Sequence, residues 1–242
     1  MMSTAPDQTF RIYYLSEQVL TIEFGQEIAE HIFLKVHGFN NLLNRQPFPG
    51  FVTTVPAYAT LTVYYDVIKV AAANMAGMDC FEKVSAYLTM LANAQKNMPA
   101  LGGDAITIPV CYGGDFGPDI DEVAVLNQIS AQEVIQLHSA ATYLVYMVGF
   151  VPGFAYMGGI DEKLATPRKT TPRKAVPAGS VGIAGRQTGI YPLQSPGGWQ
   201  IIGQTPLKLF DAHRPQPPLL KAGDRVVFKP IDQLEFNDLS AG

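Results

Sequence analysis

Cysteine is scarce in this chain, and the spacings typical of metal sites are absent. Its 242 residues include only two cysteines, Cys80 and Cys111, which form no metal-binding pair, and no His-Glu-x-x-His segment occurs. No metal site is therefore predicted. So few cysteines also favour a reduced, cytoplasmic protein over one held together by disulfide bonds.

The sequence also lacks the phosphate-binding loop found in many proteins that use ATP. No Gly-Lys pair occurs anywhere in the chain, which excludes the Walker motif. If ATP takes part in the function, we expect this chain not to hold it in that manner.

Signals for secretion and for membrane insertion are also missing or interrupted. Residues 1–8 contain no apolar run behind a basic flank, so no signal peptide is predicted. Residues 139–160 are uncharged and long enough to span a bilayer. They are broken by Pro152-Gly153 and Gly158-Gly159, so a buried pair of strands is the preferred interpretation and no membrane partner is expected.

Lysine and arginine are missing from residues 97–162, which hold eight acidic residues. Residues 163–210 show the reverse, with seven basic residues and no acidic one. Because the net charge is −4 and the cationic stretch is short, nucleic-acid binding is not expected. The stretch is either a solvated loop face or a site that attracts a small anion such as a carboxylate or phosphate.

Residues 1–96 have the pattern of a small α+β domain, with helices packed on one face of a sheet. The helix over 79–95 begins with the spacing of a capping box, Asp79 to Glu82. Residues 96–103 are predicted to be a linker. Strands are expected at 10–15, 19–24, 52–55 and 61–66, and helices at 26–44 and 79–95.

The pattern of residues 104–242 predicts a mostly β domain with two short helices. The helices are expected to start at two further capping-box spacings, Asp119 to Glu122 and Ser130 to Glu133. Strands are expected at 105–111 and 142–150, and from there to the end of the chain only strands and turns are indicated. Many short strands without helices between them favour a closed barrel.

Glycine is concentrated near the middle of this second domain. Seven glycines fall within residues 179–203, among alternating apolar residues. A helix is excluded there, since each interior glycine costs roughly 1 kcal/mol relative to alanine. We predict short strands joined by tight turns, with the backbone brought close to a neighbour. Just before this glycine-rich stretch, Thr-Pro-Arg-Lys occurs twice, at 166–169 and 171–174, and predicts an extended loop.

Two residues are candidates for catalysis, Ser180 and His138. Ser180, in Ala178-Gly-Ser-Val-Gly182, resembles a nucleophile elbow only faintly, because alanine replaces the first glycine and no helix is expected after it. A serine in a tight turn is the simpler interpretation. His138 falls on the inward face of a predicted helix, where it is either a structural core residue or, as a titratable group, part of a site.

Five segments of this region together resemble the family of 5-oxoprolinase B subunits. That family includes the sporulation-kinase inhibitor KipI and is also called allophanate hydrolase subunit 1. The resemblance extends from about residue 13 to residue 236. Its segments are Gly149–Phe154, Ala165–Arg168, Val176–Gly185, Gln187–Pro192 and Ser195–Trp199.

The resemblance implies that the barrel is cyclophilin-like. It also implies that this chain acts with the cyclophilin-like C subunit and the separate A subunit of 5-oxoprolinase to convert 5-oxoproline, ATP and water to glutamate, ADP and phosphate. Arginine side chains bind carboxylates through two parallel hydrogen bonds. Polar side chains would form hydrogen bonds to the lactam, and aromatic side chains would line its pocket. Packing in the core explains the aromatic residues equally well. The expected substrate-binding residues are Phe154, Tyr156, Arg168, Arg173, Gln187, Thr188, Tyr191 and Trp199.

Other functions within the family stay open at this point. A KipI-like protein would bind a sensor histidine kinase and block its autophosphorylation. The relation to urea carboxyltransferase domains makes membership of a urea amidolyase or allophanate hydrolase system conceivable. Prolyl isomerase activity is disfavoured, because a fold does not imply a function. With no phosphate motif and no evident nucleophile, a substrate-binding half-site completed by partner subunits is the preferred hypothesis.

Overall fold

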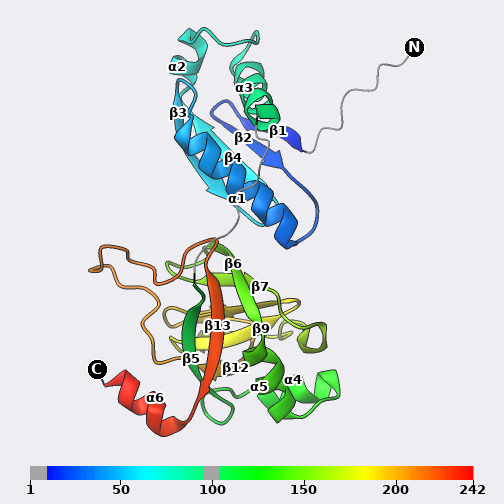
Figure 1. Ribbon diagram of the computed structural model, residues 1–242, viewed down its shortest axis with the longest axis vertical. Helices are drawn as coiled ribbons and strands as arrows, with labels where there is room; N and C mark the ends of the chain where they lie inside the picture. Colours follow the sequence, from blue (N-terminus) through cyan, green and yellow to red (C-terminus); the bar gives the residue numbers. More distant parts are fainter. Residues whose placement is uncertain (1–9, 95–103, 242) are drawn as a thin grey trace. The chain divides into compact units, whose positions relative to one another are not determined.

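The computed structural model describes residues 10–94 and 104–241. The chain divides into two compact units, Met1–Leu101 and Gly102–Gly242 (Figure 1). The predicted linker at 96–103 lies outside the described residues.

The first unit has an antiparallel sheet with strand order β1-β2-β4-β3. Alternate residues of β2 and β4, such as Leu20 and Leu61, are fully buried together with Val36 of α1 and Leu88 of α3. The predicted α+β layer is present, but α1 begins four residues later than expected. The elements are β1 (Arg11–Ser16), β2 (Val19–Glu23), α1 (Glu30–Arg45), β3 (Phe51–Pro56), β4 (Thr60–Tyr65), α2 (Val67–Ala72) and α3 (Cys80–Ala94).

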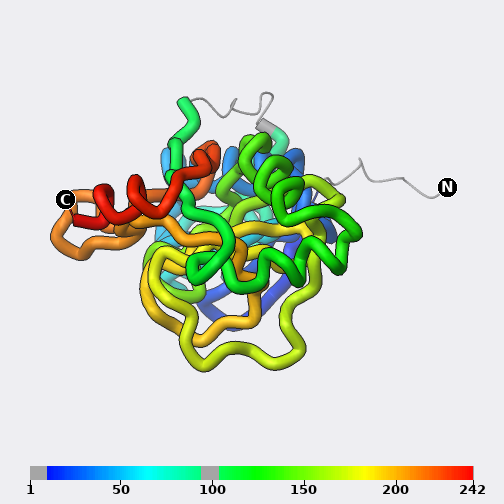
Figure 2. Tube along the Cα trace, turned by 90° about the horizontal axis from the view of Figure 1, so that it is seen from below, coloured from blue at the N-terminus to red at the C-terminus, as the bar shows by residue number. Residues whose placement is uncertain are grey.

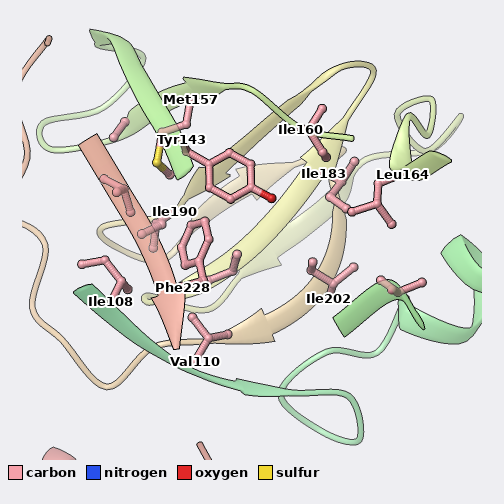
Figure 3. Close-up of a cluster of buried hydrophobic side chains, with 14 of the residues drawn as sticks. Ile108, Val110, Tyr143, Met157, Ile160, Leu164, Ile183, Ile190, Ile202 and Phe228 are labelled. Atoms are coloured by element: carbon pink, nitrogen blue, oxygen red, sulfur yellow. The ribbon is translucent and has the colours of Figure 1, made fainter. Parts of the chain in front are cut away.

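The second unit is a closed barrel with strand order β10-β7-β6-β13-β5-β12-β9. Neighbouring strands are antiparallel except β13 and β5, which are parallel. Large side chains such as Tyr143, Ile183 and Phe228 fill its interior (Figure 3). The expected closed barrel is confirmed, while its likeness to cyclophilin stays a prediction. The strands are β5 (Ile106–Tyr112), β6 (Thr142–Val148), β7 (Ala155–Gly158), β9 (Ser180–Ala184), β10 (Gln187–Ile190), β12 (Gln200–Gln204) and β13 (Arg225–Ile231).

The helices of the second unit correct two expectations. Ser130 does cap α5 (Ala131–Ala140), accepting a hydrogen bond from the Glu133 amide at 3.1 Å. Asp119 precedes α4 (Ile120–Asn127), but its side chain makes no cap hydrogen bond. The expectation of only strands and turns near the end of the chain is wrong, because α6 (Gln233–Ser240) forms there. No residue of α6 is buried, so it leaves little apolar periodicity in the sequence.

The uncharged stretch 139–160 folds mainly as the β6–β7 hairpin of the barrel, so the buried strand pair is confirmed. None of the helices within the described residues is both long and apolar enough to span a membrane.

A wide excursion separates β7 from β9 and lies outside the barrel wall, seen in yellow-green in Figure 2. It carries the short 3-10 helix η1 (Glu162–Leu164), the doubled Thr-Pro-Arg-Lys segment and β8 (Arg173–Val176). β8 pairs with β11 (Ser195–Gly197) in a separate two-stranded sheet. This pairing brings residues 166–174, which we call the cationic loop, beside the segment that leads into Trp199.

Candidate functional site

A cavity of about 230 Å³ lies between the cationic loop, the β6–β7 turn and the β11 segment. It is smaller than the roughly 300–1,000 Å³ of pockets for drug-sized ligands, so it suits a small metabolite. Its lining residues are Phe150, Phe154, Tyr156, Arg168, Pro172, Tyr191, Pro196, Gly197, Gly198 and Trp199.

Aromatic rings form the floor of this cavity. Phe154, Tyr191 and Trp199 are almost completely buried. The ring of Phe154 meets Tyr191 edge to face at 5.1 Å and Trp199 at 5.4 Å, measured between centroids. Edge-to-face packing is a preferred aromatic geometry and fixes each ring in place. The floor is therefore rigid and apolar.

Arg168 is the cation at this cavity. Its guanidinium carbon lies 5.9 Å from the Trp199 ring centroid, within the range of a cation–π interaction. The side chain is exposed, and its guanidinium makes no hydrogen bond or ion pair to any other described residue. Because its five donors stay available, Arg168 can bind a carboxylate with both arms of its fork.

The glycines at this cavity let the backbone approach the floor. A Cβ atom on Gly197 would collide with the hydroxyl of Tyr191. Only glycine therefore fits between β11 and the aromatic floor, as predicted for the glycine-rich stretch.

An ion cluster around the buried carboxylate of Asp119 anchors the cationic loop. The carboxylate of Asp119, with its side chain only 3% exposed, accepts hydrogen bonds from Arg173 at 2.6 Å and Lys169 at 3.0 Å. Its second oxygen accepts the Ile201 amide at 2.6 Å. Lys169 also reaches Glu122 at 2.6 Å. Burial alone would raise the pKa of Asp119, but the bonds from Arg173, the Ile201 amide and Lys169 outweigh it and hold that pKa below its ordinary value.

This cluster separates the two arginines that were expected to act alike. Arg173 is committed to Asp119 and does not line the cavity. Its hydrogen bond to the Asp119 carboxylate raises the pKa of Arg173. We therefore correct the expectation for Arg173: it positions the loop, whereas Arg168 faces the cavity.

The structure places four other predicted site residues away from the cavity. His138 is fully buried in the barrel, and its two ring nitrogens contact the hydroxyls of Tyr112 at 2.8 Å and Thr188 at 2.9 Å. Thr188 donates its own proton to the Gly182 carbonyl, so it accepts from the histidine Nε2–H. His138 is thus a satisfied core residue. The Thr188 hydroxyl is also fully used in this network, since it accepts from His138 and donates to the Gly182 carbonyl.

Ser180 and Gln187 likewise do not contribute to the cavity. Ser180 is 2% exposed at the start of β9, where no helix follows. This placement agrees with the simpler interpretation of Ser180 as a turn residue, and a catalytic role for it stays a prediction. Gln187, on β10, is half-buried, and its Nε2 has no hydrogen-bond partner in the described part of the chain.

Acidification is expected to destabilise the barrel through His138. Burial lowers its pKa from 6.5 to about 3, so below pH 6.5 the unfolded chain binds a proton that the folded chain does not. The contribution of neutral His138 to the free energy of unfolding is fully present above pH 6.5 and is lost as the pH drops towards 3. The expected loss between pH 7 and pH 5 is about 2 kcal/mol. Urea unfolding at both pH values measures this loss, and His138→Gln should show correspondingly less pH dependence. Equal dependence in both proteins would contradict the account.

A second hollow of about 270 Å³ lies beside the first and also includes Arg168. Among the described residues, its lining holds no aromatic one and includes the polar side chains of Glu122, Lys169, Thr170, Thr171 and Gln200. Arg168 thus borders an aromatic cavity and a polar hollow.

Two residues at the site were not expected from the sequence. Asp119 was interpreted as a helix cap, because its spacing to Glu122 fits one. Phe150 lies at the cavity mouth, 63% exposed. The only signal for Phe150 was its place between glycines in the Gly149–Phe154 segment.

Comparison with known proteins agrees with the motifs. Residues 10–220 match the family described as carboxyltransferase domain, subdomain C and D. The chain is 43% identical to the 5-oxoprolinase B subunit of Bacillus subtilis over 234 residues, covering 94% of this chain and 95% of that protein. It is 57% identical to the 5-oxoprolinase B subunit of Haemophilus influenzae over 126 residues, covering 52% of this chain and 59% of that protein.

A solved structure supports the same relationship. A conserved uncharacterized protein from Pyrococcus horikoshii is 44% identical, with a TM-score of 0.55, over 93% of this chain and 100% of that one. The family match over residues 10–220 and the near-complete Bacillus match establish the relationship. The chain belongs to the carboxyltransferase domain, subdomain C and D family, and within it to the group of 5-oxoprolinase B subunits.

Proposed function

We propose that this chain supplies the substrate-binding half-site of an ATP-dependent 5-oxoprolinase. The observation that carries this proposal is the cavity in which Arg168, free of ion pairs within the described residues, borders a buried aromatic floor. The names of the related proteins support the same assignment.

The chemistry of 5-oxoproline fits this cavity. The molecule is a small five-membered lactam ring with one carboxylate. Its carboxylate matches the open guanidinium of Arg168, which can bind it with two parallel hydrogen bonds. Its ring can lie against Trp199 and Phe154, where burial of apolar surface stabilises it.

The chain's own part in the reaction is binding and orientation. A lactam is a poor electrophile, so transfer of the γ-phosphoryl group of ATP to the amide oxygen activates the ring carbon. Water then adds, the carbon–nitrogen bond breaks, and a second water releases phosphate from the acyl phosphate. No acidic residue, histidine or cysteine lines the described walls of the cavity. We therefore assign proton transfer and ATP binding to the two partner subunits of the enzyme.

Trp199 gives a direct test of this assignment. It is the only tryptophan in the chain and lies in the cavity floor. We expect 5-oxoproline to change its fluorescence saturably, whereas 2-pyrrolidinone, which has the same lactam ring without the carboxylate, should bind at least roughly tenfold more weakly because it cannot pair with Arg168. Equal responses to both compounds would contradict carboxylate recognition. No response to either would contradict a ring-binding floor.

A further inference from the structure

Phe150 has a backbone conformation that a phenylalanine rarely adopts. Its φ angle is +69°, and only one other non-glycine residue in the described ranges, Gln128 with φ +57°, has a positive value. Gln128 ends α4, where a left-handed residue is common. Phe150 has no such role. A left-handed conformation in a residue with a Cβ atom costs free energy, and such strain is often found at functional positions.

The surrounding turn holds Phe150 in this conformation. The Gly149 amide donates to the Phe154 carbonyl at 3.0 Å, and the Val151 amide donates to the Gly149 carbonyl at 2.9 Å. Gly153, with φ +86°, completes the turn, where a Cβ atom would collide with Phe210. The hydrogen bonds are therefore made by the backbone and would be kept, with less strain, if glycine stood at position 150.

Packing does not explain the phenylalanine either. Its side chain is 63% exposed, while Phe154 in the same turn is buried. Phe150 does contact the cavity: its ring meets that of Phe154 edge to face at 5.8 Å, and it is one of the lining residues. A large apolar ring is thus held, at a cost in backbone strain, at the open side of an aromatic floor.

We propose that Phe150 determines specificity for ring-shaped carboxylates by covering the exposed face of a ring that lies on the Phe154–Trp199 floor. This inference rests on the proposed function, and it names the substrate class of the same cavity. An open-chain carboxylate such as glutamate offers Arg168 the same charge but no ring face for Phe150 to cover. Phe150 therefore strengthens binding of the cyclic substrate more than binding of the open-chain product.

The test compares dissociation constants for 5-oxoproline and L-glutamate, measured by Trp199 fluorescence on the full chain. Phe150→Gly is expected to weaken 5-oxoproline binding roughly three- to tenfold, the size of one aromatic contact, and to leave glutamate binding unchanged. Its unfolding midpoint in urea should equal or exceed that of the wild type, because glycine accepts the left-handed conformation. Phe150→Tyr, which keeps the ring, should retain the preference for 5-oxoproline.

Gln128→Gly is the matched control, since it relieves the other left-handed residue away from the cavity and should leave both dissociation constants unchanged. If the wild type binds 5-oxoproline and Phe150→Gly binds it equally well, the role of Phe150 is overturned while the proposed function stands. If Phe150→Gly weakens both ligands equally, the ring specificity is overturned. If the wild type binds neither ligand, the proposed function fails, and the role of Phe150 fails with it.

Discussion

Replacing Arg168 with glutamine is expected to raise the KM for 5-oxoproline roughly 10- to 100-fold in the assembled enzyme, with kcat nearly unchanged. Hydrogen bonds to a charged group contribute about 1.5–3 kcal/mol, which corresponds to this range. The carboxylate does not react, so its contact with Arg168 is equally strong in the ground state and the transition state. Loss of such uniform binding changes KM and spares kcat.

Two further variants define what Arg168 does. Arg168→Lys keeps the charge but not the planar fork, so it should recover only part of the affinity. Arg186→Gln is the matched control, because Arg186 is exposed, pairs with Glu162 and does not line the cavity. If Arg186→Gln impaired KM as strongly as Arg168→Gln, general charge attraction rather than a defined contact would explain binding.

Replacing Asp119 with asparagine is expected to lower the unfolding free energy of the barrel by about 3 kcal/mol. Removing one partner of a buried ion pair leaves the other charges uncompensated, which typically costs about 3–5 kcal/mol. The lower end applies, because the Lys169 and Arg173 side chains are 21% and 29% exposed and can be partly solvated. Urea unfolding measures the loss at neutral pH, where the lowered pKa keeps Asp119 ionised.

The neighbouring carboxylate provides the control for Asp119. Glu122 pairs with the same lysine, but its side chain is 48% exposed, so Glu122→Gln should cost less than about 1 kcal/mol. Asp119→Asn should also weaken 5-oxoproline binding, because the loop that carries Arg168 loses its anchor. Similar stability losses in both variants would contradict a specific role for the buried carboxylate.

The parts of the fold that the sequence predicted correctly are those with strong local patterns. Alternating apolar residues and glycine-rich turns indicated the strands, and Pro152-Gly153 marked the β6–β7 turn. The exposed helix α6 was missed because it has no buried face. For Phe154 and Trp199 the sequence left two interpretations open, a pocket wall and core packing; both side chains are buried in one cluster and also line the cavity, so their role in binding stays a prediction.

The different roles of Arg168 and Arg173 could not be predicted from the sequence. Arg168 and Arg173 occupy the same position in two copies of Thr-Pro-Arg-Lys. What separates them is Asp119, which lies 54 residues before Arg173 and reaches it only because β12 and α4 pack together. Local spacing instead favoured a helix cap for Asp119. A long-range ion pair leaves no periodic signal.

Glutamate release from 5-oxoproline and ATP tests the central claim most directly, using the two partner subunits of 5-oxoprolinase with and without this chain. We predict release only when this chain is present. If the two partners, shown to be folded and associated, release glutamate equally well without it, then the claim of a required substrate-binding half-site is wrong. If no mixture releases glutamate, the enzymatic role is contradicted, and inhibition of histidine-kinase autophosphorylation becomes the function to measure.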